Sequence, residues 1–246
     1  MRHAILALVL TGSAATAQDG PAGIAFELGI GAQSAPGYFG SDSNQTGPTG
    51  SFALDRFTFG SLGTSGEDKT GLGVTGSFRY IGARTSDDYA ELTGLNDIDA
   101  ALEVGGGVTY TGPNFEVYAV ARRGLGGHEG YVGELGGDLI FYPSQAVTLR
   151  VGPRLLAGDD DYAGTYFGVT AAEAAASSFS AFEASGGAMS RGVEISADYA
   201  LTSDWGLTGT LRYDELLNDA ARSPITQSAD QVTVGLVVTR DFSFGF

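Results

Sequence analysis

The segment from Gln231 to Phe246 constrains the fold more than any other part of the chain. Side chains on a β-strand alternate between its two faces. The odd-numbered positions here are mostly small or polar, and the even-numbered positions are Val232, Val234, Leu236, Val238, Arg240, Phe242, Phe244 and Phe246. A soluble strand rarely exposes so many large apolar groups, whereas a transmembrane β-strand turns such a face to lipid and its other face to the lumen. The pattern predicts a transmembrane β-barrel.

The final aromatic residues also predict a partner. Phe242, Phe244 and Phe246 resemble the signal that bacterial outer-membrane proteins present to the barrel-assembly machinery. Arg240 fits the apolar face poorly, because a basic residue at the bilayer midplane costs about 2–4 kcal/mol. Either its charged group reaches an interface or a bulge shifts the phase of the strand.

The N-terminal residues have the form of an export signal. Arg2 and His3 precede an apolar run, Ala4–Leu10, and the sequence Ala15-Thr16-Ala17 is typical of a cleavage site. We expect a signal peptide over residues 1–17, cleaved after Ala17, and a single domain over residues 18–246. The chain has no cysteine, so disulfides and thiol chemistry are excluded.

Composition agrees with a barrel placed in the bacterial outer membrane. The chain has 39 Gly, 14 Phe, 11 Tyr and only 7 Pro, and its mean hydropathy is +0.04, as expected where apolar and polar residues alternate. The formal net charge of −16 argues against nucleic acid as a partner. Outer-membrane lipid, including lipopolysaccharide, is the expected surrounding.

Alternation of character predicts an antiparallel up-and-down barrel of about ten strands, with eight or twelve as alternatives. In the second strand Phe52, Leu54, Phe57 and Phe59 do not keep one phase, which predicts a bulge. The strands are expected at or within residues 23–32, 47–60, 71–81, 99–110, 115–123, 131–142, 147–156, 187–201, 205–213 and 231–246.

The connections alternate in length, as they do in outer-membrane barrels, which have short periplasmic turns and long external loops. The expected external set is 33–46, 82–98, 124–130, 157–186 and 214–230, and the expected periplasmic set is 61–70, 111–114, 143–146 and 202–204. Aromatic residues are expected at both membrane interfaces. They are Tyr110, Phe115, Tyr142, Trp205 and Phe246 at periplasmic strand ends, and Tyr80 and Tyr213 at external ends.

One external loop contains a helix signal. Thr170-Ala171-Ala172-Glu173 has the form of a capping box and runs into further alanines, which predicts a short helix.

The glycine pattern from Gly71 to Gly76 matches G-x-G-x-x-G, the pattern of dinucleotide-binding loops, but it lies inside an alternating strand and does not open a helix. We therefore expect no cofactor.

Two features allow weak catalytic or metal-binding hypotheses. Asp159, Asp160 and Asp161 could contribute to a calcium site, but their spacing fits no established loop, and a solvated charge run explains them better. His128 is the only histidine left after removal of the signal peptide, and it lies in an external connection beside Glu129. No nucleophile accompanies it in the sequence, so we expect no metal site and no enzyme.

The predicted inward face carries charges of both signs. A barrel of about ten strands has little internal room, so the charges either pair into a plug of side chains or line a narrow cation-preferring channel; the first is favoured. The predicted lumen charges are Glu27, Arg79, Glu103, Glu116, Arg122, Glu134, Asp138, Arg150, Arg154, Glu194, Asp198, Arg212 and Asp241.

Several short motifs together resemble the MipA/OmpV family of outer-membrane proteins. They are Pro36-Gly37-Tyr38-Phe39-Gly40-Ser41, Gly127-His128-Glu129-Gly130, Tyr162 with Tyr166-Phe167-Gly168-Val169, Ser223-Pro224-Ile225, and the hairpin containing Tyr199, Trp205 and Tyr213. The resemblance implies an outer-membrane barrel without a catalytic motif. Within that family it implies three roles: a scaffold joining a murein transglycosylase to a murein synthase, a small porin, or a surface adhesin. The scaffold is the preferred hypothesis.

Overall fold

The computed structural model describes residues 23–59, 62–64 and 70–245. The predicted signal peptide and Phe246 lie outside these residues. Strands dominate the described chain, and ten of them are long. Their bounds are β1 Gly23–Pro36, β2 Asn44–Phe59, β4 Gly71–Ile81, β5 Ala101–Thr111, β6 Phe115–Gly126, β7 Tyr131–Ser144, β8 Val147–Gly158, β9 Gly187–Ala200, β10 Trp205–Leu216 and β11 Asp230–Gly245, with a short β3 at Leu62–Thr64.

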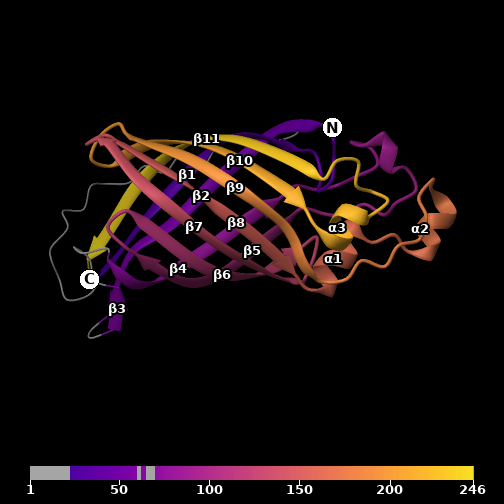
Figure 1. The fold of residues 1–246 in the computed structure, drawn as a ribbon, viewed down its shortest axis with the longest axis horizontal. Coiled ribbons are helices and arrows are strands. Elements are labelled where there is room, and N and C mark those ends of the chain that lie inside the picture. The colour runs from indigo at the N-terminus through magenta and orange to yellow at the C-terminus, as the bar shows by residue number, and fades with distance from the viewer. Residues whose placement is uncertain (1–22, 60–61, 65–69, 246) are drawn as a thin grey trace.

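The strands form one antiparallel sheet that curls into a barrel wall (Figure 1). The order in the sheet is β3-β2-β1-β11-β10-β9-β8-β7-β6-β5-β4, so the first and last long strands, β1 and β11, pair with each other. The predicted fold class, an antiparallel up-and-down barrel of about ten strands, is confirmed. Among the described residues, no helix has the length and apolar character needed to cross a membrane.

The register explains the broken phase of the second strand. Ala25 pairs with Arg56 while its neighbour Phe26 pairs with Leu54, so Asp55 is an extra residue in β2. The predicted bulge is therefore confirmed. Because one extra residue exchanges the two faces of a strand, the aromatic residues on either side of Asp55 could not keep one alternation.

The outward face of the wall is apolar, as the alternation predicts. In β11 the side chains of Val234 and Leu236 are about half exposed, whereas Val237 and Thr239 on the other face are buried. The aromatic residues expected at the strand ends are also exposed: Tyr80, Tyr110, Phe115, Tyr142, Trp205 and Tyr213. An apolar exterior of this kind is suited to hydrocarbon, not to water.

Arg240 sits among the interfacial aromatic residues. It pairs in register with Trp205, the first residue of β10. Its Cζ atom lies 5.1 Å from the centre of the Trp205 ring and 5.0 Å from that of Phe242. The pairing of β11 with β1 and β10 shows no shift at this position, so a bulge does not explain the residue. The position of Arg240 is explained by its cation–π contacts with Trp205 and Phe242 at the strand end.

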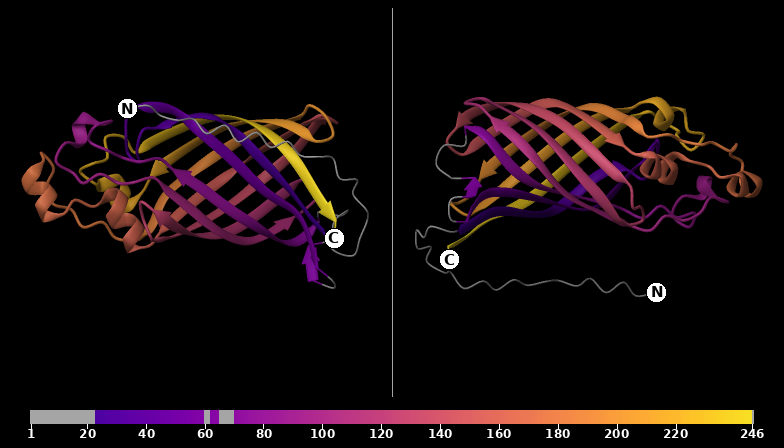
Figure 2. Two further views of the ribbon diagram at one scale, coloured as in Figure 1. Left: turned by 180° about the vertical axis from the view of Figure 1, so that it is seen from behind. Right: turned by 90° about the horizontal axis from the view of Figure 1, so that it is seen from below.

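The two ends of the barrel differ. Helices α1 Asp160–Phe167, α2 Ala171–Ala176 and α3 Asn218–Arg222 gather at one end, here called the capped end (Figures 1 and 2). A single 3-10 turn, η1 at Ala90–Leu92, belongs to the β4–β5 connection, which joins strands at the same end. The opposite end, here called the turn end, carries the short connections, the end of β11 and β3 (Figure 1). This division matches the predicted alternation of loop lengths.

Local sequence explains the helices of the capped end. Thr170 caps α2, and Glu173 completes a capping box with it, so the predicted helix is confirmed. Asp159 caps α1 by accepting from the backbone N–H of Tyr162, and Asp160 and Asp161 occupy its first turn. The aspartate run is therefore a helix start, where negative charge is favourable. Sequence analysis had interpreted it as an external charge run and did not predict α1 or α3.

Candidate functional site: the charged barrel interior and its cap

A buried carboxylate organises the barrel interior. Glu103 in β5 is completely buried and accepts hydrogen bonds from two guanidinium groups. Arg79 in β4 donates to both of its oxygens, from Nε at 2.9 Å and from Nη2 at 2.7 Å. Arg122 in β6 donates from Nε at 3.1 Å. Bidentate, charge-assisted bonds of this kind are among the strongest that side chains make.

The network continues across the interior to the far wall. The Nη2 atom of Arg122 donates to Glu134 in β7 at 2.9 Å. Arg212 in β10 lies 3.8 Å from Glu134 and 3.7 Å from Glu194 in β9. Arg154 in β8 then contacts Glu194 and Asp138, with the shorter distances both 2.9 Å. Because these residues come from seven strands, the ion pairs span the barrel interior.

Strand parity directs each of these groups inward. In β7, for example, Glu134 and Asp138 share a face with the buried Val132 and Ile140, whereas Leu135 and Leu139 are exposed. The opposed charges meet because antiparallel register sets acids and arginines side by side. Arg79 pairs with Glu103 across β4–β5, and Arg212 pairs with Glu194 across β9–β10.

The remaining predicted lumen charges lie outside this network. Arg150 forms a salt bridge with Asp198, and Glu116 accepts from the Thr111 hydroxyl at 2.9 Å. Glu27 and Asp241 face each other in the β1–β11 register. Sequence analysis missed two members of the network. Tyr118 donates to Glu134 at 2.8 Å, and Asp214 accepts from Arg212 at 2.6 Å; both have inward parity, which could have identified them.

The cap closes over this network with aromatic side chains. Arg79 Nη2 lies 3.3 Å from the hydroxyl of Tyr162 in α1 and donates to it, and Arg79 Cζ lies 5.9 Å from the centre of the Phe39 ring. Phe39 packs edge-on against Tyr166 at 5.0 Å. Tyr162 and Phe167 are among the most deeply buried large side chains. Helix α1 therefore fills the capped end of the barrel.

His128 is part of this aromatic layer. Its ring stands edge-on to Tyr162 at 5.2 Å and to Tyr166 at 5.4 Å. Its Nε2 atom lies 3.3 Å from Glu103 Oε1, but neither ring nitrogen has a partner in hydrogen-bonding geometry among the described residues. Burial lowers the pKa of His128 despite the attraction of Glu103. A buried, neutral histidine between tyrosine rings is placed to pack, not to meet a substrate from solvent.

Besides the aromatic layer around Tyr162, a second hydrophobic cluster packs the connections of the capped end against one another. Tyr38 packs edge-on against Tyr89, with ring centres 5.1 Å apart. Burial, reinforced by Glu91, raises the pKa of Tyr38 to about 12, so its hydroxyl is protonated when it accepts from Gln227 at 2.8 Å. The members of the cluster are Tyr38, Tyr89, Leu92, Leu95, Val169 and Ile225.

Four of the five motifs that resemble the MipA/OmpV family meet in the aromatic layer and this cluster; the fifth, the hairpin with Tyr199, Trp205 and Tyr213, lies in the wall in β9 and β10. Ser223 Oγ donates to the carbonyl of Phe167 at 2.6 Å, which joins the last loop to α1. Gly40 has φ of +91°, a conformation that favours glycine, and a Cβ there would lie 2.7 Å from Thr226 Oγ1. The motifs are thus far apart in sequence but build one folded cap from four connections.

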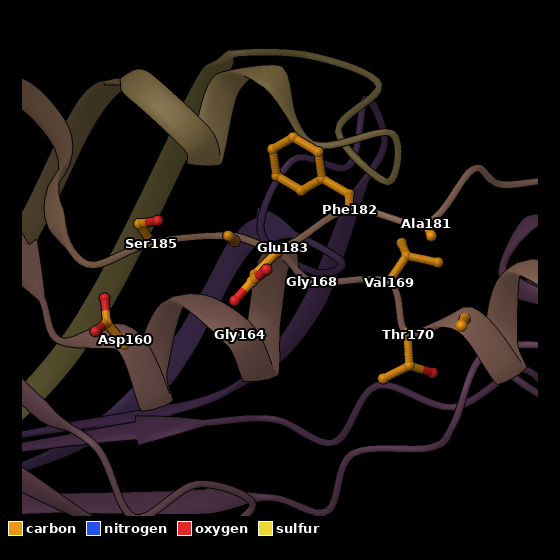
Figure 3. A pocket seen from close by; sticks show the side chains of 11 residues that line it. Asp160, Gly164, Gly168, Val169, Thr170, Ala181, Phe182, Glu183 and Ser185 are labelled. Carbon is orange, nitrogen blue, oxygen red and sulfur yellow. The ribbon is translucent and has the colours of Figure 1, made fainter.

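A shallow recess lies on the outside of the cap, between α1 and the segment 181–185 (Figure 3). Its volume is about 690 Å³, and its lining is mostly small side chains and backbone. Asp160 and Glu183 stand at its wall (Figure 3), but Asp160 already accepts from the backbone N–H of Gly186 at 2.6 Å. Within the described residues no group of three metal-ligating side chains is placed to hold an ion.

Replacing Glu103 tests the importance of the network. Glu103→Leu leaves two arginines without their shared carboxylate, and breaking a buried ion pair typically costs about 3–5 kcal/mol. We expect the free energy of unfolding, measured by urea titration in lipid vesicles, to fall by about that amount. The matched control is Glu129→Leu, whose side chain is 81% exposed and whose loss should cost less than about 0.5 kcal/mol. Equal effects of the two substitutions would contradict the assignment of Glu103 as the carboxylate that organises the network.

The neutral state of His128 predicts a pH dependence. Its pKa is lower in the folded protein than in the unfolded chain, so the unfolded chain binds the proton more readily. The stabilisation is fully present above the ordinary value of about 6.5 and is lost as the pH falls from there toward the folded pKa. Between pH 7.5 and 5.5 the wild type should lose more thermal stability than His128→Phe. A variant that loses as much as the wild type would refute the prediction.

Comparison with known proteins places the chain in a family. The sequence model of the family described as MltA-interacting protein MipA matches residues 28–242. A search of curated proteins found no match. Among solved structures, an outer-membrane channel from Pseudomonas putida is 12% identical with a TM-score of 0.44, and covers 92% of this chain and 97% of its own.

Two further solved barrels are similar at the same low level. The N-terminal β-barrel domain of OprF from Pseudomonas aeruginosa is 11% identical, with a TM-score of 0.33, over 88% of this chain and 97% of its own. Neisserial surface protein A is 10% identical, with a TM-score of 0.27, over 89% and 99%. The family match, by contrast, covers most of the strands and every connection of the cap. With its apolar exterior and its antiparallel wall, the chain is an outer-membrane β-barrel protein of the MipA family.

Proposed function

We propose that this protein is a non-enzymatic scaffold that holds a murein transglycosylase, and with it a murein synthase, at the periplasmic face of the outer membrane. The observation that carries the proposal is the family match over residues 28–242, a family described by its interaction with MltA. No step of this role requires a catalytic group. His128, the one histidine of the described residues, is buried under the cap.

The filled interior supports a scaffold over a pore. The ion pairs that start at Glu103 cross the barrel, and Arg122, Glu103 and Arg154 within them are buried. Tyr162 and Phe167 close the capped end above them. An aqueous channel needs a continuous polar path, and paired, buried charges under an aromatic layer do not offer one.

The turn end is the surface that would meet a periplasmic partner. Most of its connections are too short to supply the 800 Å² or so per partner that a stable complex typically buries. The exception is β3, which lies between β2 and β4 in the chain and extends beyond the wall (Figures 1 and 2). Among the described residues β3 pairs only with β2, and we propose that its other edge receives a partner strand.

Affinity capture tests the scaffold. The detergent-solubilised protein should enrich a murein transglycosylase from envelope extracts of its own host. Replacing residues 60–70 by a short Asn-Gly turn should reduce the capture about tenfold or more, because β3, the strand proposed to pair with the partner, is removed. The control replaces the turn residues 201–204, which leaves β3 in place. Capture without any murein enzyme would refute the scaffold, and equal capture by both variants would refute this docking site.

Planar-bilayer recording tests the pore alternative. Because the interior is filled and the cap is folded, the refolded wild type should give no reproducible conductance steps at 1 M KCl. A porin of known conductance, recorded in the same bilayers, serves as the control. Regular, cation-selective steps from the wild type would reverse the preference and favour the pore.

A further inference from the structure

One joint of the barrel wall differs from all others. Each other neighbouring pair of long strands shares an antiparallel ladder, including β1 with β11 from Gly23–Gly245 to Ser34–Val234. In the described residues no ladder joins β2 to β4, although the two strands lie side by side. The joint between them, here called the seam, is defined by residues 49–52 of β2 and 75–79 of β4.

Among the described residues, side-chain contacts join the two strands at the seam. The rings of Phe52 and Phe78 lie 6.0 Å apart. Gly76 leaves room for this contact, since a Cβ there would come within 3.1 Å of Phe52 Cε1. Unpaired backbone groups in hydrocarbon cost several kcal/mol each. The barrel wall should therefore separate most readily at the seam, where no ladder joins the two strands.

The two lips of the seam have opposite chemistry. Phe52 shares a face with Leu28 through the β1–β2 register, and Phe78 with Leu72 and Tyr80 through strand alternation, so the outer lip is apolar. The inner lip carries hydroxyl groups. The hydroxyl of Ser51 is buried without a hydrogen-bond partner in the described structure, and that of Ser77 accepts from Arg122 Nη1 at 2.9 Å.

Positive charge lies directly inside the seam. Arg79 follows Ser77 by two positions on the inner face of β4, and its side chain is 25% exposed, more than its partner Glu103 at 0%. Arg79 and Arg122 both bind Glu103, and Arg122 also binds Glu134. An anionic group entering between β2 and β4 would therefore meet two guanidinium groups and two hydroxyls.

We propose that the seam is a lateral opening that admits an anionic amphiphile with a single hydrocarbon chain from the bilayer. Its chain would lie between Phe52 and Phe78, and its head group would reach Ser51, Ser77 and Arg79. The axial route is closed by Tyr162 above Arg79, so this lateral route is separate from conduction through the barrel. The proposal does not depend on the scaffold role.

Fluorescence quenching in vesicles tests the opening. The chain has no cysteine, so a single Thr75→Cys variant carries one bimane label on the inner lip. The control, Thr210→Cys, labels the inner face of β10, which has ladders on both sides. Stearic acid with a doxyl group near its carboxyl end should quench the Thr75 label at least threefold more than the Thr210 label. The methyl ester of the same probe should quench both labels weakly.

Two further outcomes decide the proposal. Equal quenching of both labels by the acid would overturn the opening, and equal quenching of the Thr75 label by acid and ester would overturn the anionic head group. Hydrogen exchange provides a label-free check: amides of residues 44–52 and 71–81 should exchange faster than those of 230–245. Equal protection would show a closed seam and overturn the opening.

Discussion

The need to pair backbone groups inside a bilayer governs this structure. Hydrocarbon offers no hydrogen bonds, so strands pair with their neighbours and the sheet curls into a wall. In the described residues the β2–β4 seam is the one joint of this wall without a ladder. The ladder of β1 with β11 brings the two ends of the described chain together. Once the wall is curled, strand alternation divides every residue between lipid and interior. All later features, including the buried charges, follow from that division.

The barrel interior encloses charged side chains of both signs. Acids and arginines that alternation turns inward are removed from water, which is costly unless each charge is paired. Cross-strand register provides the pairs, so that Glu103 holds Arg79 and Arg122 and the chain of contacts continues to Arg154. The cap completes the enclosure with Tyr162 and Phe39. The surfaces available for function are therefore the turn end and the seam, not the barrel axis.

The cap brings motifs that are far apart in the sequence into one folded unit. Segments around Tyr38, His128, Tyr166 and Ile225 come from four connections, and each is too short to fold by itself. Packed together, they form clusters whose polar atoms bond across loops, as Ser223 does to Phe167. A family pattern preserved in these segments is therefore explained by their shared core. It need not mark a catalytic site.

Sequence alone determined the strands, a bulge in the second strand and the helix capped by Thr170, because these depend on local periodicity and capping. Tertiary structure alone decided which charges meet, since Glu134 reaches Arg212 only across the curled interior. It also decided that the run from Asp159 begins a helix seated in the barrel, and that β2 and β4 meet without a ladder. Such contacts depend on curvature and loop packing between residues distant in sequence, which no local pattern records.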